Sequence, residues 1–363
     1  MVLFANQTGE TPKMRNTRHD HSSNPGQSSR RPHGHGPRRP FHEHPRREQP
    51  FRHGNVNSRQ PGFGAGYSQE DETHRKFKLS VAIDPSPRLR LEDGSPEMTM
   101  RAMDLICPIG MGQRGLIVAP PGSGKTTFLK HLCQSVSKSH PEMKIYCLLI
   151  DERPEEVTDF RRSVTAEVRW SSSDESYEHH IETADKLMKQ VYGEVLGGAN
   201  VMILVDSLTR LARVHNAEGR SSGRTLSGGV DARALEVPRR IFGSARKIEH
   251  GGSLTILATI LVDTGSRMDQ IIFEEFKGTG NMEVYLSREI SNQRIYPAID
   301  IPRSGTRKEE LLLDATELEP VRRMRRALAG LPFVDAIKAL LTQLHKYPTN
   351  KAFLAAVAKE MKS

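Results

Sequence analysis

The chain has 363 residues, of which 36% are hydrophobic and 27% are charged. This length is sufficient for a large buried core, and at roughly 150 residues per domain it predicts two domains or one domain with a tail. No apolar run reaches the roughly 18–20 residues that a membrane helix needs, and the first residues contain no long apolar stretch, so we expect neither a membrane protein nor a secretory signal. The three cysteines fit neither a disulfide framework nor a zinc site, which favours the cytoplasm.

Positive charge is concentrated in the first fifth of the chain. Lys and Arg total 53 against 44 Asp and Glu, which gives a formal charge of +9. Residues 1–70 hold 11 basic and 5 acidic side chains, and also 7 of the 15 histidines. A basic excess of this kind suggests a polyanionic partner.

Residues 1–75 are rich in Pro, Gly, Arg and His and poor in aliphatic side chains. Such a segment buries too little apolar surface to offset its ordering entropy, so we predict a disordered basic tail. Three roles for it remain open. The alternatives are a solvated linker, an Arg-rich segment that binds RNA phosphates and bases, and a His-rich segment that binds metal.

From about Phe77 the composition changes, and short apolar runs recur that are typical of strands covered on both faces. The predicted strands are Gly115–Pro120, Ile145–Asp151, Asn200–Asp206, Ser253–Val262 and Met282–Leu286. Helical patterns separate them at Thr126–Ser137, Tyr177–Val195 and Ala232–Lys247, and the last 50 residues also have a helical pattern. This alternation predicts an α/β fold with a mainly parallel central sheet and C-terminal helices.

The segment Ala119–Thr127, APPGSGKTT, follows the first strand and opens a helix. This is the context of a phosphate-binding loop, in which backbone N–H groups and a helix amino terminus surround phosphate oxygens. Lys125 would reach the outer phosphates and Thr126 would place its hydroxyl on Mg²⁺. Ala119 stands where the loop pattern usually has its first glycine, and the alternative is a glycine-rich turn into an ordinary helix.

Two acids end neighbouring apolar strands. Asp206 closes the run NVMILVD, where a carboxylate can hold Mg²⁺. Glu152 directly follows the predicted strand Ile145–Asp151 and could polarise an attacking water. Taken singly, the first is equally explained as a helix cap and the second as a solvated loop acid.

The segments GLIVAPPGSGKT, LLIDERPEEVTDF, VDSLTRLAR, LSGGVDARAL, EEFKGTGNMEVYLSR and RSGTRKEELL occur in this order. Together they resemble the bacterial transcription termination factor Rho family, from about Arg101 to the C-terminus. The resemblance implies a RecA-like ATPase motor over residues 109–363, preceded by a connector at 76–108. It also implies a homohexameric ring, ATP and Mg²⁺ between subunits, single-stranded RNA in the channel and action on the RNA polymerase elongation complex.

The same resemblance assigns roles to individual residues. Glu152 would be the catalytic base with Arg153 beside it, Asp206 would hold Mg²⁺ together with Thr126, and Arg307 would be an arginine finger donated to the neighbouring subunit. Tyr296 would pack on adenine. The residues expected to wrap the nucleotide are Gly110, Met111, Gly112, Gln113, Arg114, Gly115, Gly122, Ser123, Gly124, Lys125, Thr126 and Thr127.

The resemblance also implies two loops lining the central channel, at Ser221–Gly229 and Asp263–Asp269. Arg224 and Arg267 stand in them where the family carries lysine, and Lys277 is a further channel candidate for RNA. Arg and Lys keep the charge but differ in geometry. Each of these is otherwise a basic residue on a surface loop.

Two departures from the family pattern matter. Gly122 replaces a family lysine in the phosphate loop, which predicts slower turnover. The family's OB-fold RNA-binding domain has no counterpart here, because an OB barrel needs on the order of 70 residues and no such length lies between Tyr67 and Arg101. The leading hypothesis is therefore an ATP-dependent RNA translocase or helicase without the usual primary RNA site. The alternatives are a nucleotide-dependent RNA-binding regulator that does not unwind, a related rotary or export ATPase, and a DNA helicase.

Overall fold

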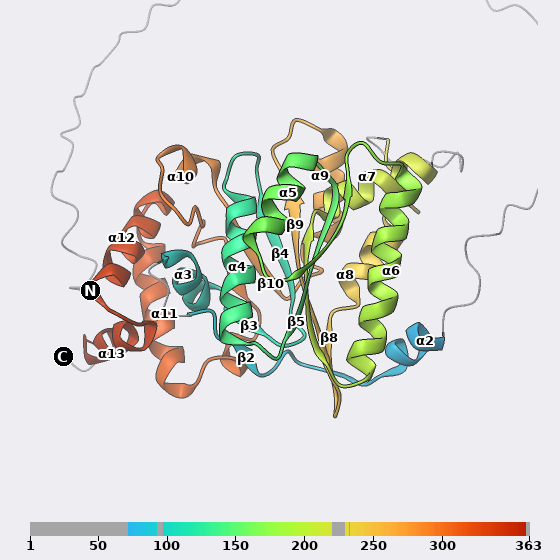
Figure 1. Ribbon diagram of the computed structural model, residues 1–363. Helices are drawn as coiled ribbons and strands as arrows, with labels where there is room; N and C mark the ends of the chain where they lie inside the picture. Colours follow the sequence, from blue (N-terminus) through green and yellow to red (C-terminus); the bar gives the residue numbers. More distant parts are fainter. Residues whose placement is uncertain (1–71, 93–96, 220–228, 232, 361–363) are drawn as a thin grey trace, which may run out of the picture. The chain divides into compact units, whose positions relative to one another are not determined.

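The computed structural model describes residues 72–92, 97–219, 229–231 and 233–360, all within one compact unit (Figure 1). Most of the expected tail, residues 1–71, lies outside the described part of the chain. The predicted boundary at residue 75 is wrong by a few residues, because helix α2 begins earlier, at Glu72–Leu79. It is held by Phe77, which is buried, and by the ring of His74, which stacks on Tyr192 with centroids 4.9 Å apart.

A nine-stranded sheet forms the centre of this unit, with the main strand order β11-β10-β4-β9-β7-β5-β6. The five pairings from β10 to β6 are all parallel, as predicted, whereas β11, β8 and β1 join by antiparallel pairing. The strands of this sheet are β1 Ala82–Ile83, β4 Arg114–Ala119, β5 Lys144–Glu152, β6 Glu167–Ser172, β7 Asn200–Asp206, β8 Arg246–Ile248, β9 Ser253–Leu261, β10 Met282–Tyr285 and β11 Gly305–Thr306. A separate short pair joins β2 Arg88–Leu89 to β3 Ile109–Gly110.

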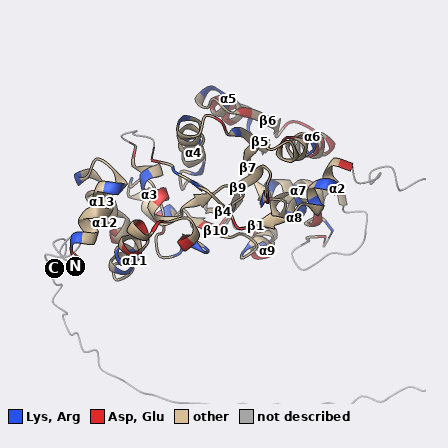
Figure 2. Cartoon of the chain, turned by 90° about the horizontal axis from the view of Figure 1, so that it is seen from below, with Lys and Arg blue, Asp and Glu red and all other residues tan. Residues whose placement is uncertain are grey.

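Helices cover both faces of the sheet, which Figure 2 shows nearly edge-on between its helical layers. Along β4, Ile117 and Ala119 join one apolar cluster while Leu116 and Val118 join the other, as the two-residue period of a strand requires. The first cluster is completed by α3 Met98–Ile106, α4 Lys125–Ser139, α5 Pro154–Ser163, α10 Arg288–Asn292, α11 Ala315–Ala329, α12 Phe333–Lys346 and α13 Asn350–Glu360. The second is completed by α6 Tyr177–Leu196, α7 Leu208–Glu218, α8 Glu236–Gly243 and α9 Arg267–Phe276.

All five predicted strands are present, with ends displaced by one residue at most. The helix predicted at Ala232–Lys247 is too long at both ends, because α8 begins only at Glu236. Helix α8 ends at Gly243, and Arg246–Ile248 is strand β8, which pairs with both β9 and β1. The expected connector at 76–108 packs into the same unit, since α3 is almost entirely buried.

The strand order brings the phosphate-loop segment, Asp206 and Glu152 to the same end of the sheet. Strands β4, β9, β7 and β5 are consecutive neighbours, and their carboxyl ends lie at one edge of the sheet. The phosphate-loop segment follows β4, Asp206 ends β7 and Glu152 ends β5. This is the edge at which open parallel sheets bind ligands.

Candidate active site

The loop between β4 and α4 has the backbone of an anion site. Gly122 and Gly124 have φ angles of +76° and +87°, which only glycine adopts readily, and Gly124 is the residue before the first turn of α4. No side chain caps this helix amino terminus, so its first N–H groups remain available to an anion. Two hydroxyls fix the loop: Ser123 Oγ donates to Pro120 O at 2.8 Å and Ser291 Oγ to Gly122 O at 2.9 Å.

Lys125, the first residue of α4, reaches the carboxyl ends of two strands. Its Nζ pairs with Asp206 Oδ1 and lies 3.8 Å from Glu152 Oε2. Thr259 on β9 donates its hydroxyl to the same Asp206 oxygen at 2.8 Å. Both carboxylates are buried, with Asp206 2% and Glu152 4% exposed, so the lysine charge offsets two acids in a site that excludes most water.

Glu152 is the carboxyl group best suited to hold a reacting water. Its Oε1 accepts from Arg210 Nη2 at 2.9 Å, whereas its Oε2 is buried and accepts no hydrogen bond from the described residues. Burial first, and then the nearby Asp206 charge, raise the pKa of Glu152 above the usual glutamate value, against the opposing charges of Lys125 and Arg210. A glutamate with a raised pKa, and with one oxygen that accepts no hydrogen bond from the described residues, is suited to accept a proton as a general base.

Arg210 is a site residue that the sequence reasoning missed. Ser207 caps α7 by accepting a hydrogen bond from the Arg210 N–H at 3.2 Å, which places Arg210 in the first helical turn directly above β5. Its guanidinium holds the Asp151 carbonyl as well as Glu152. The sequence does contain a signal for this residue, because Arg210 lies in the first turn of the helix that follows β7, and β7 ends in Asp206.

Beside the loop lies a cavity of about 210 Å³ with an aromatic wall. Tyr296 is half exposed there, and its ring would lie 3.4 Å from a Cβ placed on Gly124. The predicted residues Ser123, Gly124 and Thr127 also line this cavity, together with Thr99 and His131, which the sequence reasoning did not identify. A flat apolar ring beside a phosphate loop can stack on a planar base.

Arg153 is close in sequence but its side chain points elsewhere. It is 67% exposed and pairs with Glu156 at 3.2 Å on the first turn of α5. Thr126 follows Lys125 in the first turn of α4 and is half-buried.

Within a single chain the structure does not bring Gly110–Gly115 to the loop. The expectation that both segments wrap a nucleotide bound between subunits stays a prediction. Arg114 and Gly115 are the first two residues of β4 and the rest of the segment precedes it, whereas the loop follows the end of β4, so at least about 13 Å of strand separates them. The residues of this segment are held by the fold. A Cβ on Gly112 would lie 2.4 Å from Lys247 N, and Gln113 is buried and donates to Asn281 Oδ1 at 2.6 Å.

Of the residues expected to contact RNA, the structure describes Arg267 and Lys277, and these two are not grouped in one place. Arg267 is exposed at the start of α9, at the carboxyl edge of the sheet, whereas Lys277 follows the end of this ten-residue helix, about 15 Å away. Arg224 lies outside the described residues. The expected arginine finger, Arg307, is exposed and follows β11, at the opposite end of the sheet from Lys125.

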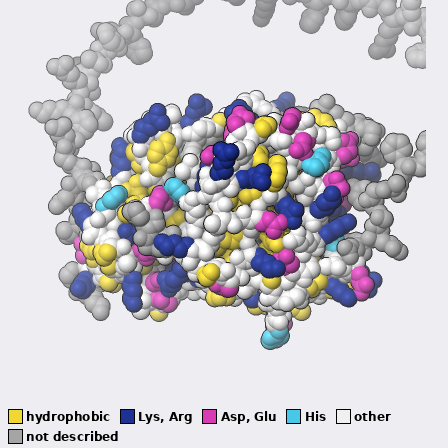
Figure 3. All heavy atoms as spheres, in the orientation of Figure 1, with side chains coloured by type: hydrophobic (Ala, Val, Ile, Leu, Met, Phe, Trp, Pro, Cys, Tyr) yellow, Lys and Arg dark blue, Asp and Glu magenta, His cyan; other side chains and the backbone are white. Residues whose placement is uncertain are grey.

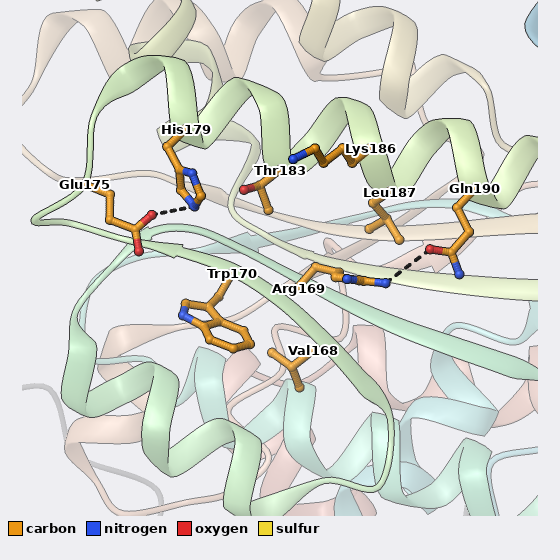
Figure 4. Close-up of a pocket in the computed structure, with 9 residues that line it drawn as sticks. All are labelled: Val168, Arg169, Trp170, Glu175, His179, Thr183, Lys186, Leu187 and Gln190. Atoms are coloured by element: carbon orange, nitrogen blue, oxygen red, sulfur yellow. Dashed lines mark hydrogen bonds and ion pairs between the residues drawn. The ribbon is translucent and has the colours of Figure 1, made fainter.

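A second cavity, of about 510 Å³, lies between β6 and α6 and is shown in Figure 4. Its polar contacts are a His179–Glu175 pair at 2.7 Å and an Arg169–Gln190 hydrogen bond at 3.3 Å. Trp170 turns away from α6 and receives the Arg161 guanidinium at 4.0 Å. None of the predicted site residues lines this cavity.

Comparison with known proteins first gives the class. Residues 99–306 match the family model described as "ATP synthase alpha/beta family, nucleotide-binding domain". An ATPase from the type III secretion system of pathogenic bacteria superimposes with a TM-score of 0.62 and 21% identity, covering 77% of this chain and 86% of that one. The ATPase of the same system from enteropathogenic E. coli gives 0.62 and 20%, covering 77% and 72%. Because the sequence identities are low, these two structural similarities support only the RecA-like fold.

Closer relatives then specify the family. Transcription termination factor Rho of Haemophilus influenzae is 49% identical over 286 residues, which is 78% of this chain and 68% of that protein. Rho of Streptomyces coelicolor is 51% identical over 292 residues, which is 80% and 70% of the two chains. The chain belongs to the transcription termination factor Rho family. The expected RecA-like fold, the family and an ATP-hydrolysing enzyme are thereby confirmed.

Proposed function

We propose that this chain hydrolyses ATP at a site completed by a neighbouring subunit of a homohexamer, and uses the energy to move along single-stranded RNA in transcription termination. The observation that carries the proposal is the meeting of Lys125, Asp206 and Glu152 at one edge of the sheet, below an uncapped glycine loop. The RNA polymerase elongation complex is the proposed target and the cytoplasm the proposed location. None of the described helices has the length and apolarity to cross a membrane.

The residues present fit Mg²⁺. Asp206 and Thr126 offer the hard oxygen ligands that this ion prefers, and the open Oε2 of Glu152 can accept a hydrogen bond from a water beside it. The ion would neutralise charge on the phosphates when bound. The loop N–H groups and Lys125 orient the triphosphate, while Tyr296 stacks on the base. Glu152, held by Arg210, accepts the proton of the attacking water, and Arg307 of the adjoining subunit offsets charge on the transferred phosphoryl group.

RNA contact is proposed for Arg267, Arg224 and the basic tail. On the face shown in Figure 3, positive and negative side chains are interspersed with apolar ones, so this face offers no extended basic surface for a polyanion. Arg267 is exposed at the start of α9, at the same end of the sheet as the residues proposed to bind the nucleotide. This shared position would couple RNA contact to ATP hydrolysis.

The test is ATP turnover with and without single-stranded RNA. We expect RNA to stimulate turnover, and Lys125→Ala to abolish it in both conditions because the phosphates lose their cation. Arg326→Ala, a change of an exposed arginine on α11, is the matched control and should leave turnover unchanged. Turnover that ignores RNA would favour an export-type ATPase, and full activity of the Lys125 variant would contradict the site itself.

A further inference from the structure

The cavity beside the phosphate loop has a histidine on its wall. His131 lies on α4 four residues after Thr127, and both residues line this cavity together with Tyr296. Residues four apart share one face of a helix, so His131 stands one turn beyond Thr127. From Lys125 to His131 the helix rises by about 9 Å. The loop is therefore at one end of the cavity, and His131 lies further along α4.

Two acceptors fix the state of the His131 ring. Glu97 Oε2 lies 3.3 Å from His131 Nδ1, and Thr99 Oγ1 lies 3.4 Å from the same nitrogen. The Thr99 hydroxyl donates its proton to Glu97 Oε1, so toward the ring it can only accept. Both neighbours of Nδ1 thus require a donor there. The neutral imidazole therefore carries its proton on Nδ1 and its lone pair on Nε2.

The Glu97 carboxylate is itself fixed by the start of α3. Glu97 is the amino-terminal cap of this helix, and its Oε2 accepts a hydrogen bond from the Thr99 N–H at 2.8 Å. Since α3 is almost entirely buried, the cap is attached to the core of the protein. The pair of Glu97 and Thr99 therefore holds His131 in one orientation.

His131 Nε2 is available to a bound molecule. It forms no hydrogen bond within the described residues, and the His131 side chain is 29% exposed. The cavity wall around it is largely apolar, with Phe128, Leu286 and Pro297 among the lining residues. A single acceptor in such a wall favours a ligand that has a hydrogen to donate at that point.

A purine presents a distinguishing group at this end of the cavity. Phosphates bound at the loop would place the ribose, and the ring nitrogen that carries it, nearest the loop. The opposite edge of the base is then directed along α4 toward His131. At this edge adenine carries an amino group at position 6, which is a donor, whereas guanine carries a carbonyl oxygen, which is an acceptor. The amino group can donate to Nε2, and the carbonyl oxygen would face a lone pair.

We propose that His131 selects a 6-amino purine. Its Nε2 accepts a hydrogen bond from the amino group of ATP, and Glu97 is the positioning residue that keeps Nε2 free of a proton. This rests on the proposed function, in which the loop binds ATP and Tyr296 stacks on the base. It goes beyond that function because a phosphate loop and a stacking ring bind any purine triphosphate, and His131 would distinguish between them.

The first test compares ATP with purine riboside triphosphate, which lacks only the 6-amino group, and with GTP. We expect the unmodified chain to prefer ATP over purine riboside triphosphate by about 3- to 10-fold in kcat/KM, the effect of one neutral hydrogen bond. The preference should appear in KM and in nucleotide affinity, with kcat unchanged, because the base is remote from the reacting phosphate. GTP should be a poorer substrate than ATP.

The second test repeats the comparison in variants. His131→Leu removes the acceptor at similar size, so ATP and purine riboside triphosphate should become equal. His131→Gln should retain part of the preference, because its carboxamide oxygen can accept. Glu97→Gln should reduce the preference, since a carboxamide can also donate to Nδ1 and shift the proton to Nε2. Lys138→Ala, at an exposed position in the last turn of α4, is the control and should keep the full preference.

The outcomes separate this inference from the proposed function. A chain that hydrolyses no nucleoside triphosphate with RNA present contradicts the proposed function, and the role of His131 falls with it. Hydrolysis with equal kcat/KM for ATP and purine riboside triphosphate leaves that function standing and overturns the role of His131. An ATP preference that survives in His131→Leu, in a protein with an unchanged unfolding midpoint, also overturns it, because another group then recognises the base.

Discussion

At the scale of single residues, the site is a balance of buried charge. Asp206 and Glu152 are both almost fully buried, and Lys125 and Arg210 are the cations that contact them. Removing either cation would leave a carboxylate without its partner, which is costly in a buried site. When phosphates take up part of the Lys125 charge, Arg210 is the contact that keeps Glu152 in place.

Glu152 gives a prediction with a definite sign. Its raised pKa means that it holds a proton at a pH where an ordinary glutamate is ionised, and a base must be ionised to act. We expect kcat/KM to fall as pH decreases through this raised value, above the pH at which a normal glutamate would protonate. Glu152→Gln should reduce turnover by about 10²- to 10⁴-fold, and its residual activity should lack that acidic limb.

The same carboxyl predicts a stability effect. The folded state binds its proton more tightly than the unfolded state, so its contribution to stability is present at low pH and is lost as pH rises through the folded pKa. Glu152→Gln should therefore be at least as stable as the parent at neutral pH, with the difference shrinking on acidification. Denaturant unfolding across pH checks this, and a large decrease in stability at neutral pH would contradict it.

The sequence predicts individual residues unevenly. Lys125, Asp206 and Glu152 are expected from strand ends and a glycine loop, and the structure brings them together. Arg210 and Thr259 are not, because their contacts depend on which strands are neighbours. The nucleotide role of Gly110–Gly115 comes from the family resemblance and stays a prediction, because β4 runs between this segment and the loop of the same chain.

At the scale of elements, continuous apolar runs identify the buried parallel strands, and the parallel strand that is missed is the one without such a run. Strand β6, EVRWSS, is an edge strand with exposed and half-buried positions alternating along most of its length, so it carries a weaker apolar signal. The prediction extends helix α8 too far at both ends, since the helical pattern of the sequence runs from Ala232 to Lys247 whereas the helix is Glu236–Gly243. The end at Gly243 and the pairing of β8 with β9 are long-range properties that local periodicity does not contain.

The segment before β4 gives a prediction at this scale. Gly112 has φ +92°, and a Cβ there would meet backbone atoms of Lys247 at 2.4 Å and of Arg246 at 2.7 Å. Gly112→Ala should lower the free energy of unfolding by about 3 kcal/mol, from strain plus the clash between two backbones. Gly243→Ala is a matched control, since a Cβ there meets nothing within 4 Å. Equal stability of the two variants in denaturant titration would contradict this close approach.

At the scale of the whole molecule, the two ends of the sheet have different chemistry. The carboxyl end holds the loop and the buried carboxylates, and the amino end holds a cluster of Arg114, Arg246 and Arg307, none of which forms an ion pair with an acid of the described residues. In a head-to-tail ring each interface can pair one end with the other, so every subunit would contribute to two sites. This arrangement is implied by the family resemblance and does not follow from local sequence, because the cluster joins residues from three distant segments.

The basic tail is tested by removing it. Residues 1–70 hold 11 basic against 5 acidic side chains, so their contribution to RNA binding would be largely electrostatic. A chain beginning at residue 72 should bind single-stranded RNA more weakly at low salt. Its log Kd should also depend less steeply on log salt, by roughly 0.7 for each phosphate that the tail no longer neutralises.

A full-length variant with the Lys and Arg of residues 1–70 changed to Gln should behave like the truncated chain, which separates the effect of charge from the effect of length. Turnover without RNA should be the same in all three proteins. Unchanged affinity of the truncated chain at low salt would show that RNA binding does not use the tail.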